Sequence, residues 1–128
     1  QRRLTGYINV DGPYVSNMNA MLFYARNTIP ESDSVAFLPG EDPFFAFTGR
    51  KNPLPFSQMN DATFDSSPQD VVSQLDAAGV RWVIVKTVFQ SKFGFVHLEP
   101  YIHEIQKEYQ LETQLSGYDI YQRRPNVL

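Results

Sequence analysis

The chain has 128 residues and a hydrophobic content of 42%, which is typical of one folded domain and excludes a disordered chain. Its net charge of -3 argues against a nucleic-acid interface, which needs a basic face. The absence of cysteine excludes disulfides, thiolate zinc sites and cysteine nucleophiles. No apolar run is long enough to cross a bilayer, and no signal-peptide pattern is present. Because the chain starts at Gln1 without Met, we expect an excised or processed piece of a longer protein.

The first half of the chain predicts a helix, a strand and a short helix. Apolar residues spaced three and four apart predict a helix from about Tyr14 to Thr28, stopped by Pro30. The run Ser34–Leu38 predicts a short strand, and a short helix starting at Asp42-Pro43 is expected to end at Gly49. Residues 50–56 are interrupted by prolines and form at best an edge strand.

The most apolar run, Gly79–Lys86, predicts a strand buried on both faces. A helix leads into it, with Ser67 as the N-cap, Pro68 at the first position and Asp70 as the acid of a capping box. Gly79 fits the left-handed residue that ends such a helix. This helix–strand unit is the clearest structural prediction in the chain.

The last third predicts a loop, a helix and a hairpin. Residues 87–98 are rich in aromatics and are interpreted as a loop. Glu99-Pro100 opens a helix whose apolar face is expected to include Tyr109. Residues 111–115 and 118–122 are expected to pair as a hairpin across Ser116-Gly117.

The alternation of helices and buried strands predicts an α/β layered sandwich. Its central sheet is expected to be mixed but largely parallel, with the strands at Val35 and Trp82 as parallel neighbours and a C-terminal antiparallel hairpin. We expect a lead-in or linker, a single α/β domain and a tail, at residues 1–13, 14–124 and 125–128.

Motifs for catalysis, metals or cofactors are absent from the sequence. There is no nucleophile elbow, Walker pattern or Gly-x-Gly-x-x-Gly, and His97 and His103 are six residues apart rather than the four of a helical metal pair. Glu41-Asp42 is interpreted as a helix start, since acids there cap free amides. The acids Asp61 and Asp65 lie in a polar loop and are interpreted as solvated. We therefore assign no catalytic residue, no metal site and no cofactor.

Two segments are candidate functional surfaces. The first is Thr48–Lys51, where Arg50 and Lys51 could hold a phosphate or carboxylate, because ligands in open α/β sheets favour the carboxyl ends of strands. The alternative is that Arg50 pairs with an acid or a carbonyl at the edge of the core. The second is the aromatic loop, in which we expect three rings to touch a membrane or partner and a lysine to bind an anion: Phe89, Phe93, Phe95 and Lys92. The alternative is that these rings cover the sheet.

The succession of segments resembles one known family. The segments that carry the resemblance are Ile29-Pro30, Ser34–Pro39, Phe47–Arg50, Gly79–Val85 and Tyr118–Tyr121, within a span of about Tyr14 to Arg123. Together they resemble the soluble C-terminal domain of bacterial membrane glycosyltransferases such as the protein mannosyltransferases and the aminoarabinose-lipid transferases.

The resemblance implies a non-catalytic, extracytoplasmic accessory domain of an integral-membrane glycosyltransferase that uses a polyprenyl-phosphate-linked sugar. The expected partners are transmembrane helices of the same parent chain, and a lipid-linked sugar or the membrane surface. The catalytic acid of that family lies in a loop between membrane helices, so no catalytic residue is carried over. Arg50 matches a recurrent family position without an assigned role. The alternative is an independent α/β domain that binds a small acidic or phosphorylated ligand.

Overall fold

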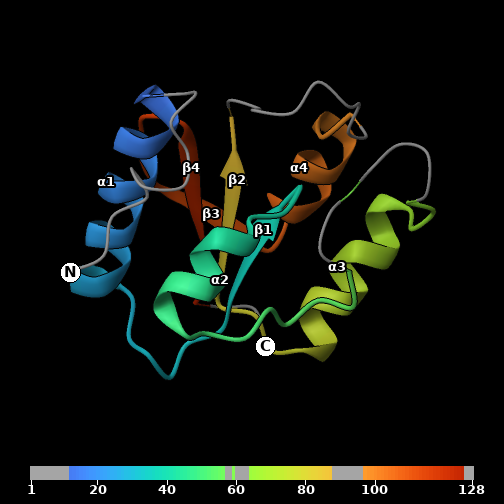
Figure 1. Ribbon diagram of the computed structural model, residues 1–128. Coiled ribbons are helices and arrows are strands. Elements are labelled where there is room, and N and C mark those ends of the chain that lie inside the picture. The colour runs from blue at the N-terminus through green and yellow to red at the C-terminus, as the bar shows by residue number, and fades with distance from the viewer. Residues whose placement is uncertain (1–11, 57–58, 60–63, 88–96, 126–128) are drawn as a thin grey trace.

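The computed structural model describes residues 12–56, 59, 64–87 and 97–125. These residues form four helices and four strands (Figure 1): α1 (Gly12–Thr28), β1 (Val35–Leu38), α2 (Asp42–Thr48), α3 (Pro68–Ala77), β2 (Trp82–Lys86), α4 (Glu99–Ile105), β3 (Tyr109–Leu115) and β4 (Tyr118–Arg123). The predicted α/β class is confirmed. Within this part of the chain, no helix has the length and apolar character needed to span a membrane.

The four described strands form one mixed sheet in the order β1-β2-β4-β3. The strands β1 and β2 are parallel neighbours, with Val35 opposite Trp82, as predicted. The C-terminal hairpin is also present, but β4 lies antiparallel to both β2 and β3. The expectation of a largely parallel sheet is therefore not met, because the hairpin adds two antiparallel pairings to a single parallel one.

Side chains of the sheet divide between two apolar clusters, one on each face. Val35 and Phe37 of β1 pack with residues of α1 and with Phe44 of α2. Ala36 and Leu38 of the same strand point the other way and pack with residues of α3 and α4. Figure 1 shows α1 on one side of the sheet, with α3 and α4 on the other. Helices therefore cover both faces of the sheet.

The helix before β2 begins and ends as the sequence predicts. The Ser67 side chain accepts a hydrogen bond from the Asp70 amide, and the Asp70 carboxylate accepts one from the Ser67 amide, which completes the capping box. Gly79 then adopts a φ of 66°, in the left-handed region that favours glycine. Trp82 and the next three residues of β2 are buried.

Several details of the elements differ from the prediction. The first helix begins at Gly12, two residues before the predicted domain start. Helix α4 ends at Ile105, so Tyr109 is the first residue of β3 rather than part of the helix, and it is fully buried. Tyr109 follows Ile105 at a helical spacing, and both side chains pack in the same apolar cluster. Spacing alone therefore does not show whether Tyr109 belongs to a helix or to a strand. The proline-rich residues 50–56 contain no strand.

Candidate functional site

A polar hollow of about 400 Å³ lies between the turn at residues 31–35 and the turn at residues 48–51. Both Arg50 and Lys51 line it, so the structure brings together two of the residues predicted to bind a ligand. The third, Lys92, lies outside the described residues, as do Phe89, Phe93 and Phe95. The predicted aromatic loop therefore has no structural description here.

Arg50 holds the end of α1 through backbone carbonyls. Its Nη2 donates to the Ile29 carbonyl at 2.9 Å, and its Nη1 donates to the carbonyls of Pro30 at 3.3 Å and Asp33 at 3.1 Å. Carbonyls at the end of a helix have no partner within the helix, and a cation there opposes the helix dipole. Among the described residues, no carboxylate forms an ion pair with Arg50. The alternative interpretation, a carbonyl at the core edge, is the arrangement that the structure shows.

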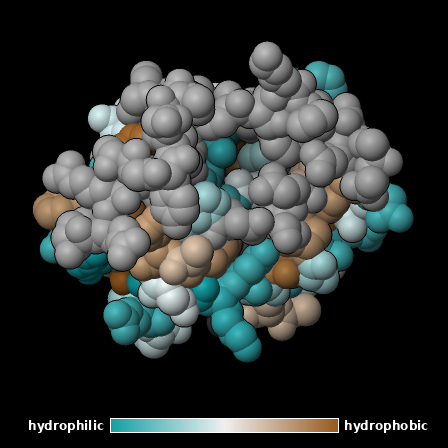
Figure 2. All heavy atoms as spheres, viewed as in Figure 1, coloured by the Kyte–Doolittle hydropathy of each residue, from teal (hydrophilic) through white to brown (hydrophobic). Residues whose placement is uncertain are grey.

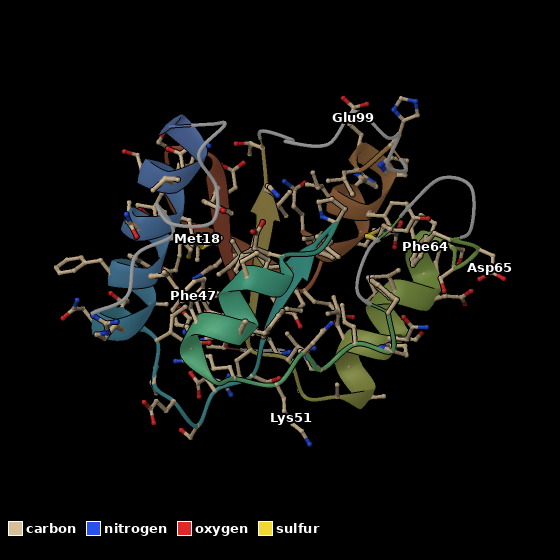
Figure 3. The ribbon with its side chains drawn as sticks, in the orientation of Figure 1. Met18, Phe47, Lys51, Phe64, Asp65 and Glu99 are labelled. Atoms are coloured by element: carbon tan, nitrogen blue, oxygen red, sulfur yellow. The ribbon has the colours of Figure 1, made fainter. Side chains whose placement is uncertain are left out.

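Local geometry aims Arg50 at these carbonyls. The short helix α2 ends at Gly49, which has a φ of 74° and whose amide donates to the Phe45 carbonyl. This left-handed step reverses the chain and directs the next residue toward the turn after α1. Lys51, one residue on, is exposed and points away from the domain in Figure 3. The two neighbouring cations thus have different surroundings.

The hollow lies at the amino end of β1, not at a carboxyl end as predicted. Its lining includes residues 33 and 34, which directly precede the strand. In Figure 1 both parallel strands run upward, whereas α2 runs back down and ends near the turn at residues 29–34. Residues 48–51 follow β1 in the sequence, but helix α2 runs back along the strand. These residues therefore lie at the amino end of β1.

The carboxyl ends of β1 and β2 carry a buried ion pair instead. The Lys86 ammonium lies 2.8 Å from Oε1 of Glu41, and the two side chains are 14% and 1% exposed, respectively. Lys86 is the last residue of β2, and Glu41 follows β1 by three positions. Glu41 occupies the N-cap position of α2, so Glu41-Asp42 marks a helix start as predicted, but the Glu41 side chain makes no capping hydrogen bond.

Sequence reasoning did not single out Lys86 or the buried role of Glu41. One signal was available: each is a charged residue that directly ends or closely follows a buried strand. Residues at the carboxyl ends of parallel strands meet at one edge of a sheet. A charge-bearing pair at that edge was therefore predictable once the two strands were expected to be parallel neighbours.

A second arginine, Arg123, forms a network at the amino end of β2. Its guanidinium lies 2.6 Å from the Asp76 carboxylate and 3.3 Å from that of Glu108, and it donates to the Tyr109 hydroxyl and the Val80 carbonyl. Burial raises the pKa of Tyr109 to about 12. The pKa of Glu108 is raised mainly by a hydrogen bond with Asp76 and, to a smaller extent, by burial. Sequence reasoning did not single out Arg123 as a candidate functional residue.

The remaining candidate groups do not form a chemical site. His97, His103 and Asp65 are exposed, and Asp61 lies outside the described residues. Within the described chain, no group of three or more histidine or acidic side chains is placed to hold a metal ion. Figure 2 shows hydrophilic and hydrophobic residues intermixed over the described part of one face, without a single continuous hydrophobic surface.

Comparisons with protein families, with curated proteins and with solved structures found no match to this chain. Any functional conclusion must therefore rest on the residues themselves and on the resemblance of the sequence segments.

Proposed function

We propose that the chain is a non-catalytic, extracytoplasmic accessory domain of an integral-membrane glycosyltransferase that uses a polyprenyl-phosphate-linked sugar donor. In this proposal the domain is a layered α/β structure, and its partners are the transmembrane helices of the same parent chain. The polyprenyl-phosphate chemistry belongs to that membrane part.

The observation that carries the proposal is the position of Arg50. Two segments of the family resemblance, Ile29-Pro30 and Phe47–Arg50, are separated in sequence but meet through the guanidinium of Arg50. A recurrent arginine that holds a helix end supports the fold and has no direct part in a reaction. This is what an accessory domain requires, and it gives the recurrent position a structural reason.

Membrane topology tests the proposal. Because the chain contains no cysteine, a cysteine introduced at exposed Lys51 is the only thiol in this domain. In intact cells expressing the complete parent protein, we expect a membrane-impermeant thiol reagent to label Lys51→Cys. Met21→Cys, at a fully buried position, is the matched control and should be labelled only after denaturation.

The reading frame that contains Gln1 provides a second test. We expect it to encode several apolar segments of about 20 residues each, the length that crosses a bilayer. Labelling of Lys51→Cys only after cell lysis, together with a parent protein without such segments, would contradict the proposal.

A second candidate function, an independent α/β domain for a small acidic or phosphorylated ligand, is favoured by one observation. Lys86 and Glu41 form an ion pair at the sheet edge where such ligands bind in α/β proteins. A parent protein without membrane segments would favour this candidate over the first.

A further inference from the structure

We propose that the polar hollow is a binding site for a small zwitterion, a molecule that carries both an ammonium and a carboxylate group. The turn at residues 31–35 contacts the ammonium, and the turn at residues 48–51 contacts the carboxylate. This assignment goes beyond the accessory role proposed above. It is compatible with either candidate function, since a tethered domain and an independent one can both bind such a ligand.

The size and lining of the hollow suit a small polar molecule. Its volume of about 400 Å³ lies within the range of small-molecule sites, roughly 300–1,000 Å³. Polar residues from both turns line it, and among the described lining residues Val35 is the one large apolar side chain. An apolar molecule therefore finds little surface to pack against, whereas a polar one finds hydrogen-bonding groups on two sides.

The charges of the lining are divided between the two turns. One turn contributes two acids, Glu31 and Asp33, and the other contributes two bases, Arg50 and Lys51. The lining is therefore neutral in sum, but it has an acidic side and a basic side. A simple anion is repelled by the acids and a simple cation by the bases. A zwitterion that lies across the hollow places each of its charges beside the opposite charge.

The Asp33 carboxylate is held in position and keeps one oxygen for a ligand. Its Oδ2 accepts a hydrogen bond from the Trp82 indole at 3.0 Å, and Trp82 is 4% exposed. Within the part of the chain that the structure describes, Oδ1 of Asp33 has no hydrogen-bond donor. Binding costs less when a contacting side chain is already ordered. Asp33 is therefore the residue that receives the ammonium.

Arg50 keeps donors for the carboxylate. A guanidinium has five N–H donors, and the bonds of Arg50 to the carbonyls of Ile29, Pro30 and Asp33 use three of them. The Nε hydrogen and one Nη2 hydrogen have no acceptor among the described residues. Such donors form strong, charge-assisted bonds with carboxylate oxygens. Lys51 lies at the rim with its exposed side chain directed outward (Figure 3), so its charge adds attraction without filling the hollow.

A neutral molecule with several hydroxyl groups is the nearest competing ligand. Ser32 and Ser34 line the hollow and bind hydroxyls as readily as charges. Hydrogen bonds in which a partner is ionised are roughly twice as strong as neutral ones. Since both turns present ionised groups, a ligand with a charge at each end gains more than a neutral one.

Titration by NMR tests the site in the unmodified chain. The isotope-labelled 128-residue protein is titrated at constant pH and ionic strength with 4-aminobutyrate, and separately with acetate, methylammonium and glycerol. We expect 4-aminobutyrate to cause saturable shifts of the amide signals of Ser32, Ser34 and Gly49. The other three probes should bind at least about tenfold more weakly, the scale of one charged hydrogen bond. Equal binding of any of them, shifts centred elsewhere, or no saturable shift with 4-aminobutyrate would overturn the proposal.

Asp33→Asn tests the ammonium contact. The amide oxygen of asparagine can still accept from the Trp82 indole, so the variant loses the charge and keeps that hydrogen bond. We expect it to bind 4-aminobutyrate at least about tenfold more weakly. The matched control is Asp65→Asn, which neutralises an exposed acid outside the hollow and should bind as the unmodified protein does. Unchanged binding in Asp33→Asn, or equal weakening in both variants, would refute the contact.

A charge reversal at the rim tests the basic side without disturbing a buried group. Lys51→Glu gives the lining three acids and one base, so the preference should move from 4-aminobutyrate toward 1,4-diaminobutane. We expect the ratio of the two affinities to change by about threefold, the scale of an exposed charge contact. Lys107→Glu makes the same change of net charge at a lysine that is 61% exposed on another surface, and it should leave the ratio unchanged. An equal change in both variants would overturn the site. Topology labelling in intact cells needs no ligand, so the two proposals can fail separately.

Discussion

The two ends of the parallel strand pair are built differently. At the amino ends, two arginines bind backbone carbonyls: Arg50 holds the turn after α1, and Arg123 holds Val80 just before β2. The Trp82 indole also donates to Asp33 there, at 3.0 Å. At the carboxyl ends, Glu41 and Lys86 form a buried ion pair instead.

The two ends thus use charge in different ways. A guanidinium surrounded by carbonyls adds hydrogen bonds to backbone groups beside the ends of helices and strands. At the carboxyl ends, Lys86 meets the buried carboxylate of Glu41. The amino ends therefore use charge to hold the backbone, whereas the carboxyl ends pair two side-chain charges with each other. Substitutions at both ends test this comparison.

The largest effect is expected at the carboxyl ends. Lys86→Met alone leaves the Glu41 carboxylate buried without its lysine, and should lower the free energy of unfolding by about 3–5 kcal/mol. The paired Glu41→Met/Lys86→Met should recover most of that loss. Urea denaturation measures both. If the paired variant is as unstable as the single one, the ion pair is a structural element, and the comparison between the two ends fails.

Arg123→Ala is expected to have the next largest effect. It removes bonds to the Val80 carbonyl and the Tyr109 hydroxyl and leaves two carboxylates, Asp76 and Glu108, without their shared cation. We expect the free energy of unfolding to fall by about 3 kcal/mol, typical of a broken buried network. Arg124→Ala is the matched control, since that arginine makes one exposed contact to the Gln106 carbonyl, and should change stability by less than about 1 kcal/mol.

Arg50→Ala should cost about 1–2 kcal/mol, since its contacts to three carbonyls are only partly buried. The neighbouring Lys51→Ala should change stability by no more than about 0.5 kcal/mol, because its side chain is exposed. Thermal or urea unfolding compares the two variants directly. Unchanged stability of Arg50→Ala would argue against a structural role for this arginine.

The smallest effect is a dependence of stability on pH. The pKa of Glu108 is raised in the folded protein, chiefly by its hydrogen bond with Asp76. The resulting stabilisation is fully present below the ordinary pKa of about 4.5 and is lost as pH rises through the higher folded value. Glu108→Gln imitates the protonated form at every pH. The difference in free energy of unfolding, variant minus unmodified protein, should therefore be larger at pH 7 than at pH 4. Denaturation at both pH values measures this, and a constant difference would argue against the raised pKa.

Local sequence signals predicted the elements that depend on a few neighbouring residues. Ser67, Asp70 and Gly79 specified both ends of α3, because capping groups and a left-handed glycine act within one turn. The apolar run of β2 predicted a buried strand, and the sheet confirms it. The prediction of Tyr109 on a helix is wrong because Tyr109 of β3 and Ile105 of α4 pack in the same apolar cluster and are four residues apart, which is a helical spacing.

The sequence by itself determined the α/β class, the parallel neighbours β1 and β2 and the closing hairpin, since these follow from periodicity and turn residues. Only the tertiary structure decided that Arg50 returns to the amino end of β1, and that Glu41 reaches Lys86 across 45 positions of the chain. Both contacts depend on the direction in which α2 leaves the sheet. Phe44 of α2 packs against Phe37 of β1, with ring centroids 4.6 Å apart, and such a contact between two elements cannot be read from the local sequence of either one.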